Sequence, residues 1–493
     1  MRRNTAYSFA VQAATTVFTM VLTLFLVRAL GAERYGTFAV ALAVGGLVLL
    51  PADFGISASA ARFLAESVND ATRRRATMIA AFRLKLATSL AVGAGMAVLA
   101  GPIAAVYGQP ALVWPLRGVA IAVAGQGLVR LAVSACSSQQ RSSLSFAIVT
   151  LESFAETTAS IALVAAGGGA AGAAFGRAIG YAVGATVGVV VILRLFGLTP
   201  KALFAGRSER SLGRRIAGYA GAVAIVDSVW SLFMQIDILL IGAILTSTAA
   251  GVFQAPVRLL TVISYPGIAL GAAIGPRLAR ITPDSRPDPR PLVEAARVLL
   301  VVQTFAAAVV VAWSVTLATA VLGGGYAESG RIFAALGPYV VVSGLAPLLS
   351  NGIDYVGGTR RRMTIGIVTV LVNAAIDATL LPRIGVVAAA IGTDVAYVLY
   401  VTGHIRVARE LLGLRPAEIG PTFLRCLGAG VPTAALLFGG AQEGAAGLVL
   451  AGIAAAPLYV GLLLALGEGE TVRPWLRRLG RMTRTSIRTR YSG

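Results

Sequence analysis

Residues 6–28 read AYSFAVQAATTVFTMVLTLFLVR and carry no charged side chain before the final Arg28. The next apolar stretch, residues 36–59, reads GTFAVALAVGGLVLLPADFGISAS and contains one charged residue, Asp53. An α-helix rises about 1.5 Å per residue, so each stretch is long enough to cross the roughly 30 Å hydrocarbon core of a bilayer. The two stretches therefore predict a pair of membrane-spanning helices at the start of the chain.

Similar apolar stretches recur along the whole chain and end at glycine, proline or charge clusters. Of the 493 residues, 57% are hydrophobic and 13% are charged, and the mean hydropathy is +0.81. So few charges cannot cover a folded surface in water, which excludes soluble globular and disordered proteins. The further predicted spans are residues 78–106, 111–135, 144–166, 171–193, 215–244, 250–275, 295–322, 331–351, 364–381, 385–405, 420–440 and 445–467. The predicted fold class is an all-α polytopic membrane protein with about 14 transmembrane helices.

The basic residues test this number of spans, because cytoplasmic loops collect arginine and lysine. With the amino terminus inside, 34 of the 42 Lys and Arg residues fall in segments expected to face the cytoplasm, Lys85 among them. The formal net charge of +21 then reflects topology and attraction to anionic lipid, so nucleic acid is not an expected partner. Both termini are expected in the cytoplasm.

A constant offset of 215 residues aligns the second predicted span with the eighth. The matching pairs are Gly36 with Gly251, Phe38 with Phe253, Pro51 with Pro266, and Arg62 with Arg277. Six spans per repeat make the two repeats parallel, and transporters of this kind bind substrate at the repeat interface. The expected domains are an N-terminal six-helix bundle (1–214), a C-terminal six-helix bundle (215–410), an appended hairpin (411–467) and a basic tail (468–493).

The sequence contains no pattern typical of an enzyme. Neither lysine follows a glycine, so no phosphate-binding Walker A loop is present, and no G-x-S-x-G nucleophile motif occurs. One histidine, His404, cannot build a metal site with two distant cysteines. The loops are too short for the ordered catalytic domain that a polymer ligase normally needs. We expect no enzyme activity, no cofactor and no metal site.

Four residues are candidates for the substrate path. An arginine at the bilayer centre costs about 2.5 to 3.5 kcal/mol on insertion scales, so it should face a cavity or a carboxylate. Arg177 and Arg258 are the interior arginines expected to bind phosphate, with structural pairing to an acid as the alternative. Arg28 ends the first span, where a gate, a turn anchor and an interface residue are all open. Asp53 marks a bent or broken helix, with a hinge and a substrate path both open.

Five acidic residues inside predicted spans are candidates for binding a coupling ion: Glu152, Glu156, Asp227, Asp237 and Asp377. Glu152 and Glu156 share a helix face, and two such carboxylates in low dielectric do not both ionise easily, which would suit proton coupling. The alternative is pairing with Arg177 from the next span. Asp227 and Asp237 lie about 80° apart around one helix, so one can face a cavity while the other contacts a neighbour. For Asp377, the alternative is a polar contact between helices.

Several segments resemble bacterial polysaccharide transporters, the O-antigen flippase-like members of the multidrug/oligosaccharidyl-lipid/polysaccharide exporter superfamily. Residues 28–36, RALGAERYG, followed by residues 53–56, DFGI, resemble the opening of these proteins. Residues 237–242, DILLIG, and 275–278, GPRL, look like the family's seventh and eighth helices. Residues 381–391, LPRIGVVAAAI, are similar to its eleventh and twelfth helices.

The resemblance implies two bundles around a central cavity that opens alternately to each side of the cytoplasmic (inner) membrane. The implied function is a flippase that moves a polyprenyl-diphosphate-linked oligosaccharide to the outer leaflet. Expected partners are this lipid-linked oligosaccharide, membrane lipids, H+ or Na+ as the coupling ion, and the polysaccharide polymerase machinery. The alternatives on the same fold are a multidrug or cation antiporter and a flippase for the peptidoglycan precursor. An antiporter predicts an acid-dominated cavity, and a flippase predicts a positive one.

Overall fold

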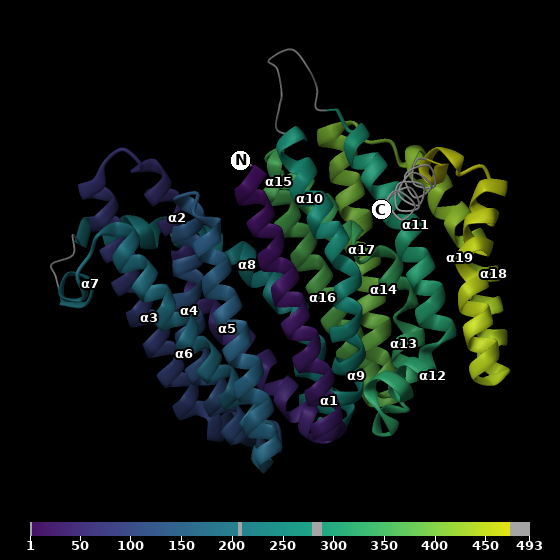
Figure 1. Ribbon diagram of the computed structural model, residues 1–493, viewed down its shortest axis with the longest axis horizontal. Helices are drawn as coiled ribbons and strands as arrows, with labels where there is room; N and C mark the ends of the chain where they lie inside the picture. Colours follow the sequence, from purple (N-terminus) through teal and green to yellow (C-terminus); the bar gives the residue numbers. More distant parts are fainter. Residues whose placement is uncertain (1, 206–209, 279–287, 474–493) are drawn as a thin grey trace, which may run out of the picture. The chain divides into compact units, whose positions relative to one another are not determined.

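The computed structural model describes residues 2–205, 210–278 and 288–473, and within these ranges it contains helices and no strand (Figure 1). Of the described residues, 91% are helical. The helices longer than ten residues are α1 (Arg2–Asp53), α2 (Ile56–Glu66), α3 (Ala71–Val106), α4 (Val113–Ser138), α5 (Ser142–Leu163), α6 (Gly169–Phe196), α8 (Arg210–Ile244), α9 (Ser247–Leu260), α10 (Tyr265–Leu278), α11 (Arg290–Ala312), α15 (Leu345–Tyr355), α16 (Thr359–Ile384), α17 (Val387–Leu412), α18 (Gly420–Gln442) and α19 (Gly444–Ala465). The shorter pieces are η1 (Pro110–Leu112), η2 (Val164–Gly168), α7 (Pro200–Ala205), η3 (Thr261–Ser264), α12 (Ser314–Thr316), η4 (Leu317–Leu322), η5 (Gly324–Tyr326), α13 (Ser329–Ala335), α14 (Gly337–Val342) and η6 (Pro416–Glu418).

The helices are long and apolar enough to cross a membrane many times. In the described part of the chain, nine helical stretches pass this test, and a bent pair within residues 329–355 makes up to ten. Two of the nine, Ala10–Glu66 and Ser142–Phe196, have 57 and 55 residues. At 1.5 Å per residue, each contains about 80 Å of helix in total, which is enough to cross the membrane twice. When each double stretch is counted twice and the bent pair, α8 and α17 are added, the described part of the chain has 14 long helical segments, which agrees with the predicted all-α polytopic class.

The two double-length stretches turn at glycines. Gly31 has φ 69° inside α1, and Gly167 has φ 90° between α5 and α6. A left-handed backbone is unfavourable for residues with a Cβ, so glycine allows the chain to reverse without an intervening loop. The turn at Gly31 lies between the first two predicted spans, and the turn at Gly167 lies between the fifth and sixth.

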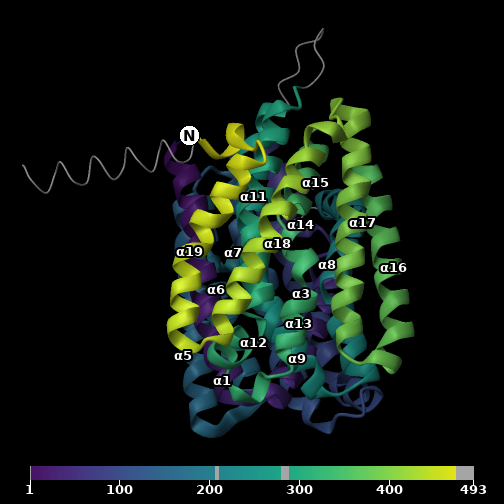
Figure 2. The same ribbon diagram turned by 90° about the vertical axis from the view of Figure 1, so that its right-hand side faces the viewer.

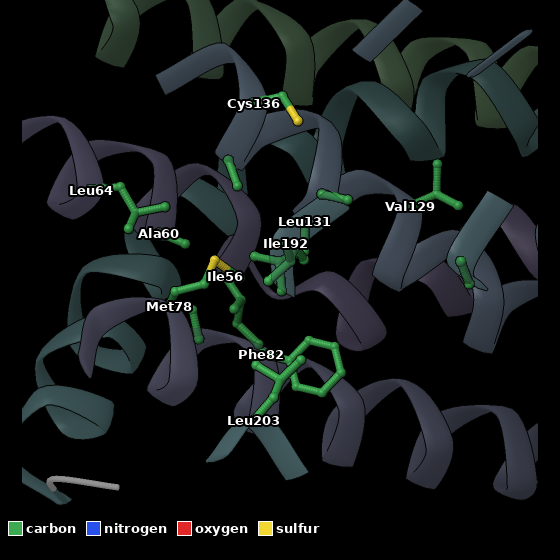
Figure 3. Packing of buried hydrophobic residues seen from close by; sticks show 14 of the residues in the cluster. Ile56, Ala60, Leu64, Met78, Phe82, Val129, Leu131, Cys136, Ile192 and Leu203 are labelled. Atoms are coloured by element: carbon green, nitrogen blue, oxygen red, sulfur yellow. The ribbon is translucent and has the colours of Figure 1, made fainter. Parts of the chain in front are cut away.

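The first compact unit comprises residues 1–255 and 377–386. Within it, α3, α4, α5 and α6 lie side by side (Figure 1). Its core is built from the apolar faces of α2, α3, α4, α6 and α7, where Ile56, Met78, Phe82 and Leu203 are all 1% exposed or less (Figure 3). The first of these residues follows directly on the break between α1 and α2, so that break is anchored in the core.

The second compact unit comprises residues 256–376 and 387–493. Helices α18 and α19 form a hairpin in it (Figure 1, Figure 2). Two polar side chains tie this hairpin to α11, because Trp313 donates its indole N–H to the Leu437 carbonyl at 3.1 Å and the Tyr459 hydroxyl donates to the Val301 carbonyl at 2.9 Å. The hairpin thus belongs to the packing of this unit.

The predicted domains at 1–214, 215–410 and 411–467 stay a prediction. The predicted domains are defined by the sequence repeat, whereas the compact units are defined by which residues contact each other. The boundary of a repeat need not coincide with the boundary of a compact unit. The basic tail predicted at 468–493 lies outside the described residues from position 474 onward.

Candidate functional site

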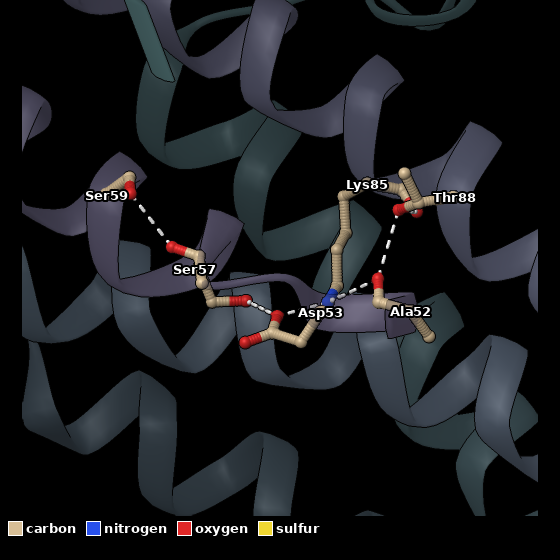
Figure 4. Close-up of polar contacts among 7 residues, drawn as sticks. Ala52, Asp53, Ser57, Ser59, Lys85 and Thr88 are labelled. Carbon is tan, nitrogen blue, oxygen red and sulfur yellow. Dashed lines mark hydrogen bonds and ion pairs between the residues drawn. The ribbon is translucent and has the colours of Figure 1, made fainter. Parts of the chain in front are cut away.

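The second span is broken between α1 and α2, and a buried ion pair lies at the break (Figure 4). Phe54 and Gly55 have φ values of 42° and 69°, so the helical hydrogen bonding is interrupted after Asp53. Lys85 of α3 is fully buried and forms an ion pair with the Asp53 carboxylate. It also donates to the Ala52 carbonyl at 3.3 Å. The lysine therefore serves both the buried acid and a carbonyl that the break has freed.

Two hydroxyl groups complete this arrangement. Thr88 donates to the same Ala52 carbonyl at 3.0 Å, and Ser57 donates to the Asp53 carboxylate at 2.6 Å. The prediction that Asp53 marks a broken helix agrees with this geometry. The placement of Lys85 among cytoplasmic loop residues is wrong, because its side chain is 0% exposed inside the first unit. The available signal was that Lys85 lies within the predicted span 78–106, where a charge needs a buried partner.

A second polar network lies between α5 and α6. Glycines at 176, 180 and 184 recur every four residues on α6, and a Cβ at each would overlap Ser160, Glu156 or Glu152 of α5. Such small-residue stripes let two membrane helices approach closely. The close approach brings the two acids of α5 to the side of α6 that carries Arg177.

Arg177 is committed to partners within this network. Its guanidinium donates to Glu156 at 2.5 Å and to the Tyr181 hydroxyl at 3.1 Å, and it also stands 4.9 Å from the Tyr181 ring centre. Glu152 lies beside Glu156 and accepts a hydrogen bond from Ser153 at 3.1 Å. Of the two possibilities left open by the sequence, the structure thus contains the pairing of Glu156 with Arg177.

A third cluster brings together two acids that are distant in sequence. Asp377 of α16 is 0% exposed and lies directly against Asp237 of α8, and both belong to the first unit. No donor among the described residues reaches either carboxyl oxygen of Asp377. Two adjacent acids in such a place need a shared proton or a bound cation. The side chain of Asp227 lies outside the described residues.

The eighth span is interrupted in the second unit. Helix α9 passes into the short 3-10 segment η3 before α10 begins, and such segments often mark hinges. Gln303 of α11 is fully buried and donates to the η3 carbonyl of Ile263 at 3.3 Å and to the Ser343 hydroxyl at 3.2 Å. Arg258 lies one turn before η3, is exposed, and has no described carboxylate within ion-pair distance. Of the two arginines expected to bind phosphate, Arg177 is paired with Glu156, whereas no described carboxylate neutralises the charge of Arg258.

Arg28 is also exposed and lies one turn before the Gly31 reversal of α1. The predicted residues therefore fall into separate groups. Glu152, Glu156 and Arg177 come together, and Asp237 and Asp377 come together. Asp53 is paired with Lys85, a residue outside the predicted set.

An apolar pocket of about 530 Å³ lies in the second unit. It is formed by α11, α13, α14, α17 and α18, and its walls are almost wholly hydrocarbon. Phe423 and Leu427 line it from α18, and Val341 and Val398 line it from α14 and α17. A pocket of this size and character suits a hydrocarbon chain.

A fourth polar cluster ties the end of α19 to the start of α18. Glu468 is 2% exposed and accepts hydrogen bonds from Thr422 at 2.9 Å, Arg425 at 2.9 Å and Thr471 at 2.7 Å. Burial alone would raise the pKa of the Glu468 carboxyl, but the hydrogen bonds from Thr471, Arg425 and Thr422 outweigh it and leave the pKa below the ordinary value. The ionised carboxylate is therefore the form that the fold stabilises.

We expect Glu468→Gln to lower the melting temperature at neutral pH and to flatten its acid dependence. A carboxyl with a lower pKa in the folded state stabilises the protein above its unfolded pKa of about 4.3, and this contribution is lost as the pH falls through the folded value. Thermal unfolding in detergent at several pH values measures it. Glu470→Gln is the control, since that side chain is 94% exposed. An unchanged acid slope in Glu468→Gln would contradict the assignment.

Residues 1–282 match the model of a family described as polysaccharide biosynthesis protein, which is more than half of the 493 residues. The chain belongs to this family. The resemblance predicted from the sequence is thereby confirmed. No curated protein matches the sequence.

Solved structures of transporters share the fold of this family member. One, described as the lipid II flippase MurJ in an inward closed conformation, has a TM-score of 0.75 at 9% identity and covers 96% of this chain and 99% of its own. A multidrug resistance MATE family transporter of the MOP superfamily in an inward-facing conformation has a TM-score of 0.57 at 16% identity, covering 80% and 94%. The eukaryotic MATE transporter AtDTX14 has a TM-score of 0.57 at 14% identity, covering 86% and 99%. At these identities the likeness establishes the fold alone.

Proposed function

We propose that this chain is a flippase that moves a polyprenyl-diphosphate-linked oligosaccharide, a repeat unit of a cell-surface polysaccharide, across the cytoplasmic membrane by alternating access. The match of residues 1–282 to the polysaccharide biosynthesis family carries the proposal. In this proposal, a membrane protein of a polysaccharide biosynthesis family handles a sugar chain attached to lipid. Both termini lie in the cytoplasm in this proposal, as the distribution of basic residues indicates.

Two features of the second unit suit the two ends of such a cargo. The exposed Arg258 offers a permanently charged, bidentate donor for a diphosphate. The apolar pocket of about 530 Å³ offers a place for part of a polyprenyl chain. A sugar diphosphate cannot cross hydrocarbon unaided, whereas its tail can remain in an apolar environment.

Deletion of the gene tests the proposed cargo. We expect lipid-linked oligosaccharide to accumulate on the cytoplasmic leaflet, with its sugars identified by mass spectrometry after extraction. Accumulation of the peptidoglycan precursor instead would support a flippase for that lipid. Altered drug sensitivity without any accumulated glycolipid would support a multidrug antiporter. Either of these results would overturn the proposal.

Arg258→Ala should impair export without lowering the amount of folded protein, because the side chain is exposed. Hydrogen bonds to charged groups contribute about 1.5 to 3 kcal/mol, so we expect a roughly 10- to 150-fold loss of export. Arg258→Lys should lose less, since it keeps the charge but not the bidentate geometry. Arg117→Ala is the matched control, because that arginine is exposed over Trp114. Equal export in Arg258→Ala and Arg117→Ala would argue against phosphate binding.

The acid pair Asp237 and Asp377 is the site we assign to the coupling cation, H+ or Na+. Asp377→Asn should abolish the dependence of export on the gradient of that ion. The coupling factor between ion and cargo, typically about 5- to 150-fold, should fall to one. Export into vesicles under separate pH and Na+ gradients distinguishes the two ions. Glu410→Gln, at an exposed pair with Arg361, controls for loss of a carboxylate. Full gradient dependence in Asp377→Asn would contradict this assignment.

A further inference from the structure

Helices α17 and α18 are consecutive in the chain, yet the apolar pocket of the second unit lies between them. Helix α18 packs against α11 and α19, whereas α17 packs against α14 and α15. In the view of Figure 2, α13 and α14 lie between α17 and α18. Val398 of α17 and Val431 of α18 both line the pocket and are 44% and 69% exposed. The pocket is therefore open along a furrow between α17 and α18.

One face of α17 runs from this pocket to the C-terminal end of the helix. Val398, Thr402, Arg406 and Arg409 are all exposed and follow one another at spacings of four, four and three residues. At about 100° per residue, the four positions lie within about 80° of one another around the helix. The hydrocarbon surface at the pocket thus gives way to two arginines along a single face.

These two arginines have no counter-charge in the described part of the chain. Neither Arg406 nor Arg409 lies within ion-pair distance of a described carboxylate. The acid next to them in sequence, Glu410, is paired with Arg361 of α16. Two neighbouring guanidinium groups on an exposed face favour a ligand that carries a phosphate, because phosphate accepts bidentate hydrogen bonds from arginine.

The spacing between the arginines and the pocket matches the depth of one leaflet. Arg406 and Arg409 follow Val398 by eight and eleven residues, which is about 12 to 16 Å along the helix. Half of the roughly 30 Å hydrocarbon core of a bilayer is about 15 Å. A lipid whose phosphate lies at these arginines therefore has the end of its chain at the level of the pocket.

The pocket itself calls for hydrocarbon. Its walls are almost wholly apolar, and an apolar cavity does not hold ordered water. Left empty, about 530 Å³ would deprive the lining side chains of dispersion contacts. Gly337 and Pro338 are part of the wall, next to the 48° bend between α13 and α14. A chain in the pocket thus also packs against this bend.

We propose that the furrow is a binding site for an anionic phospholipid, with the phosphate at Arg406 and Arg409 and one acyl chain in the pocket. The choice of leaflet rests on the proposed function, because its topology places this end of α17 at the cytoplasmic leaflet, where anionic lipids attract basic residues between helices. Phospholipid far outnumbers lipid-linked oligosaccharide in a membrane, so mass action favours it as the occupant when no cargo is bound. A polyprenyl chain that enters the pocket displaces this phospholipid.

The first test addresses the headgroup. The full-length protein in neutral detergent is titrated with phosphatidylglycerol, and native mass spectrometry counts the bound lipid. Arg406→Gln and Arg409→Gln should each weaken binding about fivefold, and together about 25-fold. Phosphatidylcholine with the same chains should bind more weakly than phosphatidylglycerol to the unmodified protein.

The matched control removes the same charge from the same end of the unit. Arg360 is exposed at the start of α16, and the pair between Arg361 and Glu410 places this start beside the end of α17. Arg360→Gln should leave the binding of phosphatidylglycerol unchanged. An equal loss in Arg360→Gln and Arg406→Gln would overturn the site, because it would reduce the effect to general attraction between charges.

The second test addresses the acyl chain. Val398→Trp fills the mouth of the pocket and should weaken binding of phosphatidylglycerol about tenfold, the effect of excluding about two methylene groups from an apolar site. Val395→Trp is the control, since Val395 is 41% exposed on the same helix but does not line the pocket. Equal binding by the two tryptophan variants would overturn the placement of the chain.

Polyprenyl phosphate distinguishes the occupants. Binding of polyprenyl phosphate that depends on Arg406 and Arg409, without any binding of phosphatidylglycerol, would assign the furrow to the cargo and overturn the proposal. None of these measurements involves transport or requires the cargo. Their failure would therefore leave the family membership and the proposed flippase function standing, and an incorrect cargo would leave the expected binding of phosphatidylglycerol unchanged.

Discussion

Lys85→Met should destabilise the protein by about 3 to 5 kcal/mol, the usual cost of removing one partner from a buried ion pair. Lys85 is fully buried, and its loss leaves the Asp53 carboxylate in the interior without its counter-charge. The Ala52 carbonyl loses one of its two donors and keeps Thr88. Denaturant unfolding in detergent micelles, followed by tryptophan fluorescence, measures the change.

A double variant distinguishes a charge effect from a packing effect. Lys85→Met combined with Asp53→Leu removes both charges and keeps apolar volume, and such replacements are often neutral or stabilising. We expect the double variant to recover most of the stability that Lys85→Met loses. If the double variant is as unstable as the sum of the single variants, the ion pair is not what holds the break between α1 and α2.

Arg177→Met should cost a similar amount, about 3 to 5 kcal/mol, because Glu156 and its neighbour Glu152 would then lie buried without a cation. Glu156→Gln should cost less, since the amide can still accept from Arg177 and Glu152 remains as a counter-ion. Thermal unfolding of the purified protein measures both. The control is Arg361→Met, at a pair whose side chains are 51% and 63% exposed. Exposed pairs contribute only about 0 to 1 kcal/mol.

The same variants separate a structural role from coupling. Glu152→Gln combined with Glu156→Gln should leave the ion-gradient dependence of export intact if these acids serve to neutralise Arg177. Loss of that dependence in a fully folded double variant would instead favour proton coupling through α5 and would weaken the assignment to Asp237 and Asp377.

Much of the architecture could be predicted because each membrane helix is specified locally. A bilayer demands about 20 apolar residues for every crossing, so the spans and the all-α class follow from hydropathy and basic residues alone. The reversal of α1 at Gly31 falls between the first two predicted spans, but hydropathy predicted a connecting segment there and not a turn within one continuous helical stretch. Hydropathy detects apolar length, and it does not detect a backbone angle.

The polar partners could be predicted only in part. Glu156 and Arg177 are on consecutive helices of a hairpin, so their pairing was among the alternatives considered. Asp237 and Asp377 are 140 positions apart, and only tertiary packing brings them together. Lys85 was misplaced because counting charges treats each lysine as a sign of topology. Its partner, Asp53, lies on another helix.

The pairing of Lys85 with Asp53 has an electrical consequence. A charge that crosses the membrane potential does work of about 2.3 kcal/mol per 100 mV, whereas two opposite charges that travel together do almost none. This pair itself therefore contributes almost nothing to the voltage dependence of a rearrangement that carries it along. Arg258 lacks a described counter-charge, so its movement across the membrane potential would contribute to a voltage dependence of turnover, as would movement of the cargo and the ion.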